Sequence, residues 1–153
     1  MIDKAREMID LSNEQIVISA WNREIEEITD ELREASSRNV SIILFSFTKI
    51  SKKFGELISY EIDEDKLRKV WKPKMILVVD KKYTMMGSAR KHDDSRSIFT
   101  ENQAITEIAT DHLILDITLA GNRLGFDSTK VVSSILDKSD FKLESLYLSL
   151  IHI

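Results

Sequence analysis

One short segment, Lys74 to Arg90 (KMILVVDKKYTMMGSAR), places a carboxylate and a small-residue pair around a predicted hairpin. The apolar run Met75 to Val79 ends on Asp80, and the pair Gly87-Ser88 closes the return strand. Two interpretations compete. In the first, the acid and the Gly-Ser pair only form the turn and the end of a tight hairpin. In the second, they are the remains of an active site that bound phosphate.

Four residues are the candidate ligand contacts, and each also has a purely structural interpretation. Asp80, ahead of two lysines, suits a turn or a cap. Ser88 can make a local hydroxyl hydrogen bond. Trp21 ends a predicted strand, where an aromatic ring usually packs in the core but can also stack on a ligand. Arg90 belongs to a basic run that is usually solvated.

The first half of the chain must position Trp21, and it has a strand–helix–strand pattern. The β-branched run of residues 15–21 predicts a buried strand, and residues 40–47 predict the next one. Between them, residues 22–37 carry a helical apolar stripe, and a shorter helix is predicted over residues 3–11. Short joints favour a βαβ unit with parallel strands.

The second half must position the hairpin. Residues 75–79 are fully apolar, as in a central strand covered on both faces, and residues 83–86 form the return strand. Residues 48–72 have no clean period and predict an irregular segment with one weak strand at 57–62. A short strand, SIFT, then leads to a long helix at 102–120. The residues expected on its core-facing stripe are Ala104, Ile105, Ile108, Leu115 and Leu119. Together these elements predict an α/β fold with a mixed sheet and helices on both faces.

Composition narrows the functional classes. The 153 residues suit one domain, and the net charge of -4 argues against a broad nucleic-acid-binding face. The absence of cysteine excludes disulfides and thiolate metal sites, and three scattered histidines suggest no zinc site. No apolar run reaches the roughly 20 residues of a membrane span. We therefore expect a cytoplasmic domain with neither metal nor cofactor.

The two ends of the chain predict a fragment of a longer protein. The last six residues, 148–153 (LSLIHI), are apolar without a cap or turn and resemble a translated sequencing adapter. They are expected to be a non-native tail behind a domain of residues 1–147. The alternative is an ordinary terminal strand.

The hairpin resembles the phospholipase D signature, HxKxxxxD followed after six residues by GSxN. With Asp80 at the position of the signature Asp, Gly87-Ser88 falls at the Gly-Ser spacing. The remaining positions depart from the family. Pro73 stands where the nucleophilic His belongs, and Met75 stands where the phosphate-binding Lys belongs. Without that histidine, the covalent phospho-intermediate that the resemblance implies cannot form. His92 and His112 lie in a loop and a helix and do not replace it.

The order of elements over about residues 3–120 is similar to the C-terminal effector domain of TrmB-type transcriptional regulators, which looks like a catalytically degenerate phospholipase D half. The resemblance implies a non-catalytic domain that binds a small effector, in this family often a sugar, and forms a homodimer. It also implies that DNA is bound only through an N-terminal winged helix-turn-helix, which is not visible in this sequence. The alternatives are a phosphodiesterase or nuclease acting as a dimer, and a stand-alone interaction domain.

Overall fold

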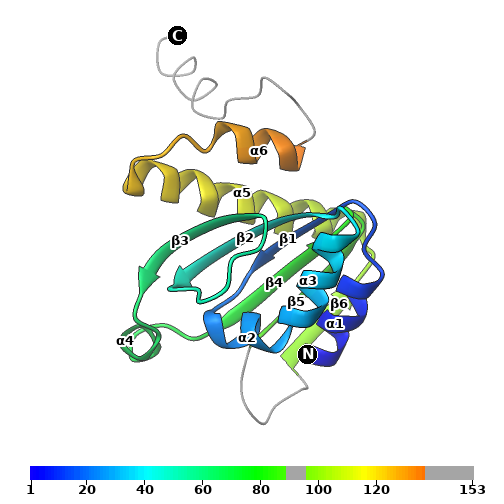
Figure 1. Ribbon diagram of the computed structural model, residues 1–153, viewed down its shortest axis with the longest axis horizontal. Coiled ribbons are helices and arrows are strands. Elements are labelled where there is room, and N and C mark those ends of the chain that lie inside the picture. Colours follow the sequence, from blue (N-terminus) through cyan, green and yellow to red (C-terminus); the bar gives the residue numbers. More distant parts are fainter. Residues whose placement is uncertain (89–95, 137–153) are drawn as a thin grey trace.

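The computed structural model describes residues 1–88 and 96–136, which form one mixed sheet between two helical layers (Figure 1). The helices are α1 (Ile2–Asp10), α2 (Asn22–Glu27), α3 (Thr29–Ser37), α4 (Glu64–Arg68), α5 (Gln103–Leu124) and α6 (Thr129–Leu136). The strands are β1 (Gln15–Ser19), β2 (Ser41–Thr48), β3 (Glu56–Ile62), β4 (Lys74–Val79), β5 (Tyr83–Ser88) and β6 (Ser97–Thr100). The predicted α/β class with a mixed sheet is confirmed.

The six strands have the order β3-β2-β1-β4-β5-β6. Strand β2 pairs in parallel with β1 and with β3, whereas β1–β4, β4–β5 and β5–β6 are antiparallel. The βαβ prediction and the central position of β4 are therefore confirmed. These directions bring the ends of β1, β2, β3 and β5 together with the start of β4. We call this end of the strands the Trp21 edge, defined by Trp21, Lys74 and Ser88. The other end of the strands is the Asp80 edge.

The first helical layer covers one face of the sheet with α1, α2 and α3 (Figure 1). The predicted helix over residues 22–37 is interrupted at Ile28, whose φ of -111° and ψ of 15° are not helical. Both halves still bury the predicted apolar stripe, which consists of Ile25, Ile28, Leu32 and Ala35. Two short helices in succession can bury the same apolar stripe as one long helix. The stripe therefore did not predict the break at Ile28.

The second layer consists of α5 and α6 on the other face of the sheet. The predicted core-facing stripe of α5 is wrong: Ile108, Leu115 and Leu119 are 68%, 57% and 44% exposed. Its buried residues lie on another side of the helix and are Thr106, Ala109, Leu113, Ile114, Ile117, Ala120 and Gly121. This helix carries apolar residues all round, so periodicity alone could not select the buried side. Small residues such as Ala109, Ala120 and Gly121 let its backbone lie close to its neighbours.

Two helices were not predicted, and both have a local signal at their start. Asp63 accepts hydrogen bonds from the backbone N–H groups of Asp65 and Lys66 at the beginning of α4. Asp127 accepts one from Thr129 N at the beginning of α6. The weak strand expected at 57–62 is present as β3, one residue longer at its start. The predicted tail, 148–153, and the candidate Arg90 lie outside the described residues.

Candidate functional site

Asp80 connects the β4–β5 turn to the segment before β1 through hydrogen bonds at the Asp80 edge. Its carboxylate accepts hydrogen bonds from the backbone N–H groups of Asn13 (2.9 Å), Glu14 (2.7 Å) and Gln15 (2.9 Å). Its own N–H donates to the Gln15 carbonyl at 2.8 Å. Asp80 and Lys81 both have positive φ, 54° and 57°, as the tight hairpin requires. The side chain therefore has a structural role, and a ligand contact by Asp80 stays a prediction.

The positions that the resemblance assigns to the phospholipase D catalytic pair, Pro73 and Met75, lie at the beginning of β4. Met75 is fully buried in the core under the first helical layer, where Met1 and Ile2 pack against the same cluster. Met75 pairs with Gly87 across the hairpin, and a Cβ on Gly87 would lie 2.9 Å from the Met1 sulfur. A side chain at position 75 thus lies in an apolar interior, which would penalise a lysine ammonium.

A small cavity of about 190 Å³ opens at the Trp21 edge, on the α5 side of the sheet. Aromatic and aliphatic side chains form much of its wall, namely Trp21, Phe47, Trp71 and Ile76. Trp21 is 3% exposed, whereas Trp71 is 53% exposed and forms the open side. An apolar cavity with a few polar groups is the usual form of a small-molecule site.

The polar lining of this cavity comes from Ser19, Lys72, Lys74, His112 and Asp116. His112 Nε2 lies 3.2 Å from the Asp116 carboxylate, one helical turn away. Burial raises the pKa of Asp116, and the charge of His112 partly opposes that effect. Lys74 Nζ lies 5.8 Å from the centre of the Trp71 ring. The cavity therefore offers hydrogen-bonding groups of both signs around an aromatic wall.

The four predicted contacts do not form one site. Ser88 pairs with Lys74, so it lies at the Trp21 edge, as Trp21 does. It does not line the cavity. Asp80 is at the opposite end of β4, roughly 20 Å away for a strand of this length. Sequence reasoning missed Phe47, Trp71 and Asp116, because no local pattern indicates which residues converge from β2, from the segment after α4 and from α5.

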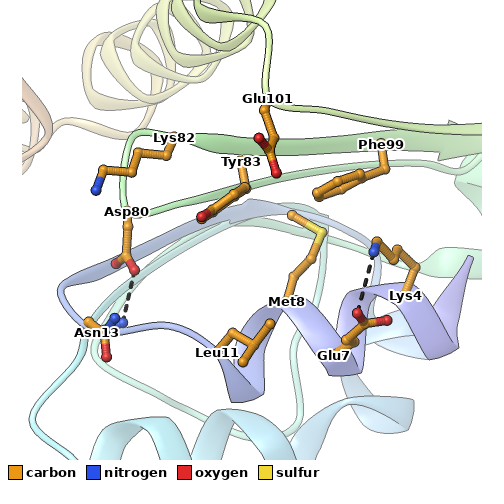
Figure 2. Close-up of a pocket in the computed structure, with 10 residues that line it drawn as sticks. All are labelled: Lys4, Glu7, Met8, Leu11, Asn13, Asp80, Lys82, Tyr83, Phe99 and Glu101. Atoms are coloured by element: carbon orange, nitrogen blue, oxygen red, sulfur yellow. Dashed lines mark hydrogen bonds and ion pairs between the residues drawn. The ribbon is translucent and has the colours of Figure 1, made fainter.

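A second, larger groove of about 410 Å³ lies at the Asp80 edge between α1 and the strands β5 and β6 (Figure 2). Its sheet side carries the rings of Tyr83 and Phe99, which stack with centroids 6.2 Å apart. Met8 and Leu11 face them from the helix side (Figure 2). Asp80 lines this groove, but its oxygens already accept the three backbone hydrogen bonds.

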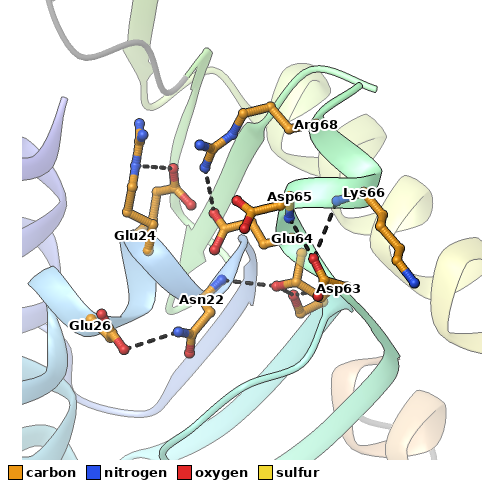
Figure 3. A network of polar contacts seen from close by, with 11 residues as sticks. Asn22, Glu24, Glu26, Asp63, Glu64, Asp65, Lys66 and Arg68 are labelled. Carbon is orange, nitrogen blue, oxygen red and sulfur yellow. Dashed lines mark hydrogen bonds and ion pairs between the residues drawn. The ribbon is translucent and has the colours of Figure 1, made fainter. Parts of the chain in front are cut away.

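A charged network surrounds the ends of the parallel strands (Figure 3). Glu24 is 3% exposed, and among the described residues its carboxylate oxygens have no hydrogen-bond partner; Arg23 Nε is 3.8 Å away. Burial raises the pKa of Glu24 from its ordinary value of 4.5, against smaller opposing effects of backbone N–H groups and Arg23. Glu64 nearby is paired with Arg68 at 3.0 Å. Within residues 1–88 and 96–136, no cluster of three or more His, Asp or Glu side chains could hold a metal ion.

None of the described helices is long and apolar enough to cross a membrane. Among curated proteins, no sequence matches this chain.

Solved structures show similarity of fold. The archaeal chromatin protein TrmBL2, whose structure is described as showing a novel mode of DNA binding, superposes with a TM-score of 0.52 at 12% identity. That match covers 72% of this chain and 45% of TrmBL2, so this chain spans less than half of its length. NucT from Helicobacter pylori gives 0.53 at 11% identity, covering 73% of this chain and 84% of NucT. Nuc from Salmonella typhimurium, a phospholipase D family member, gives 0.52 at 13%, covering 72% and 82%.

Residues 1–113 match the family described as "Transcriptional regulator TrmB, EBD N-terminal subdomain". This match takes in α1 to β6 and the first half of α5, and therefore both the Asp80 hairpin and most of the wall at the Trp21 edge. The fold around them is that of the phospholipase D family. The chain belongs to the TrmB family of transcriptional regulators.

Proposed function

We propose that this domain is a non-catalytic, effector-binding part of a transcriptional regulator. The observation that carries the proposal is the start of β4, where Pro73 and the buried Met75 occupy the positions of the nucleophile and the phosphate-binding lysine. An apolar side chain packed under α1 can neither form a phospho-intermediate nor hold a phosphate. The proposed role of the domain is therefore to bind a ligand without converting it. The TrmB family match supports a regulatory role.

The cavity at the Trp21 edge is the proposed effector site. Its aromatic wall of Trp21, Phe47 and Trp71 favours a largely neutral ligand with an apolar face, and Ser19, His112 and Asp116 supply hydrogen-bonding groups. A sugar satisfies both requirements, because its C–H face can lie on a ring while its hydroxyls bond to polar groups. Ser88 is proposed to contribute at the rim, Arg90 stays a proposed ligand contact, and Asp80 is proposed only as a distant, structural support.

The proposed partners are a second copy of the chain, a small effector, and DNA contacted through a part of the regulator outside this sequence. Effector binding would change the relative position of two subunits and so the spacing of their DNA-reading helices. The location proposed for this regulator is the cytoplasm.

Calorimetric titration with a panel of neutral sugars tests the effector site. Trp71 is half exposed, so Trp71→Ala should leave folding intact while weakening binding about tenfold, as expected for loss of an aromatic ring that contacts the ligand. Leu11→Ala changes an exposed apolar side chain at the Asp80 edge, far from the cavity, and serves as the matched control. A sugar that binds with equal affinity to both variants would place the site elsewhere.

Phosphodiesterase activity is the competing function, and one observation favours it. His112 and Asp116 form a histidine–carboxylate pair in the Trp21-edge cavity, a pairing that general bases often use. Hydrolysis of a chromogenic phosphodiester should stay at background for the native protein. Turnover that disappears in His112→Ala would overturn the non-catalytic proposal.

A further inference from the structure

The groove at the Asp80 edge has features that the proposed effector site does not use. Tyr83 and Phe99 sit on neighbouring strands with their rings only 14° from parallel, and Phe99 is 40% exposed. Leu11, on the helix side, is 69% exposed. The groove therefore has an aromatic wall and an aliphatic wall, both accessible to solvent (Figure 2).

Most charged groups in this groove already have a partner within the protein. Lys4 lies 3.5 Å from Glu7, and the Asp80 carboxylate accepts three backbone hydrogen bonds. Lys82 and Glu101 remain. Neither side chain makes a hydrogen bond or ion pair in the described part of the chain, and both residues are exposed. Figure 2 shows the Glu101 side chain pointing toward the space beside Tyr83 and Phe99.

The protein itself shows what kind of group suits this wall. Lys4 Nζ lies 4.1 Å from the centroid of the Phe99 ring, with the Glu7 carboxylate beside it. An ammonium next to both a ring face and a carboxylate gains from the ring quadrupole and from the ion pair. At the other end of the same wall, Tyr83 and Glu101 offer the same combination without an ammonium from the described residues.

We propose that this groove binds the ammonium group of a small amphipathic molecule. The ammonium lies beside Glu101 at the Tyr83 ring, and the apolar part of the ligand contacts Met8 and Leu11. A simple amine and an amino acid both carry this chemistry. Lys82 distinguishes them, since its ammonium would attract the carboxylate of an amino acid, whereas it would repel the ammonium of a simple amine. The proposal is independent of the effector site at the Trp21 edge, which lies at the other end of the strands.

The test uses the whole chain and follows backbone amide NMR signals during titration with n-pentylamine, 1-pentanol and L-leucine, each up to about 10 mM, a range that detects millimolar dissociation constants. Pentylamine should shift the signals of α1, Tyr83 and Phe99, and pentanol, of similar shape but uncharged, should bind more weakly. A lower dissociation constant for leucine than for pentylamine, lost in Lys82→Ala, would identify an amino acid as the better ligand. The opposite order would identify a simple amine.

Glu101→Gln should weaken pentylamine binding about threefold to fivefold, the range for a partly exposed ion pair, without affecting pentanol. Tyr83→Leu keeps the groove apolar but removes the ring, and should also weaken pentylamine selectively. Glu56→Gln, an exposed carboxylate at the start of β3, is the matched control. Equal binding of pentylamine and pentanol, no binding of pentylamine, or full affinity in Glu101→Gln would overturn the proposal.

Discussion

At the scale of single residues, Asp80 has a structural role that is independent of catalysis. In this chain the acid accepts hydrogen bonds from three consecutive backbone N–H groups at the start of β1. Those donors lie more than sixty positions away in sequence, so the contact joins the first turn of the domain to its central hairpin. A residue with this role is retained for folding whether or not a nucleophile stands seven positions before it.

Asp80→Asn should therefore destabilise the domain. An amide would lose the charge of the acceptor and turn one N–H₂ group toward backbone donors, which should cost about 2 kcal/mol. For a domain of this size the melting temperature should fall by roughly 4–8 °C, measured by circular dichroism. Asp111→Asn, on an exposed helical position, should leave the melting temperature unchanged. Equal melting temperatures for native protein and Asp80→Asn would contradict the role derived from these bonds.

Glu24 gives a prediction with a defined pH dependence. Burial raises its pKa above 4.5, so the folded state binds this proton more tightly than the unfolded state. The stability of the native protein should then fall as the pH rises from about 4.5 through the raised pKa of folded Glu24. Glu24→Gln removes this penalty and should raise the melting temperature at pH 7, by about 2–4 °C for each kcal/mol gained.

The gain in Glu24→Gln should shrink as the pH is lowered toward 4.5, because native Glu24 is then protonated as well. Glu26→Gln, in the same helix but exposed, controls for the change in net charge. A melting temperature that is lower in Glu24→Gln at pH 7 would mean that the charged carboxylate is stabilising and that Arg23 outweighs burial.

At the scale of elements, the sequence was a good guide to the strands and a poor one to the sides of α5. The β-branched runs of β1, β2 and β4 have few other possible structures, so their existence and parallel or central position were predictable. Helix α5 is apolar all round, and which side faces the sheet depends on how closely its backbone can approach. That depends on Ala109, Ala120 and Gly121 rather than on the largest residues. The short helices α4 and α6 had only a capping aspartate as a signal.

The buried side of α5 can be tested with two leucines two positions apart. Leu113 is fully buried and Leu115 is 57% exposed. Leu113→Ala should cost about 2–5 kcal/mol, because it removes buried methyl groups and leaves a cavity. Leu115→Ala should change stability by no more than about 0.5 kcal/mol. Urea denaturation measures both, and a larger loss for Leu115→Ala would mean that its side of α5 is covered in solution.

The candidate site was predictable only in part, because it depends on how separate elements pack together. Trp21 was singled out because it ends the predicted strand at 15–21; the strand ends at Ser19 instead, and the Trp21-edge cavity does contain Trp21. Phe47, Trp71 and Asp116 come from three other elements, and their meeting depends on the register of β2 and the placement of α5. Asp80 and Ser88 belong to one hairpin and are close in sequence, yet they lie at its opposite ends: Asp80 is in the turn, and Ser88 pairs with Lys74 at the open end.

At the scale of the whole molecule, the Trp21 edge has more exposed apolar surface than a binding cavity alone explains. Val70 and Trp71, directly after α4, are 80% and 53% exposed. The resemblance to a phospholipase D half implies that two such halves face each other at this edge. We therefore expect the chain to form a dimer through this surface, with each cavity near the partner subunit.

Sedimentation equilibrium should give twice the mass of the chain, with dissociation on dilution. Val70→Asp places a charge on the proposed interface and should shift the equilibrium to monomer, because an unpaired charge buried between subunits costs several kcal/mol. Leu11→Asp is the matched control: this leucine is 69% exposed but lies at the Asp80 edge, so dimerisation should be unaffected. A native protein that is monomeric at every concentration would contradict the dimer. A dimer disrupted by Leu11→Asp but not by Val70→Asp would move the interface to the opposite edge, and the Trp21-edge cavity would then have to bind its effector without help from a second copy.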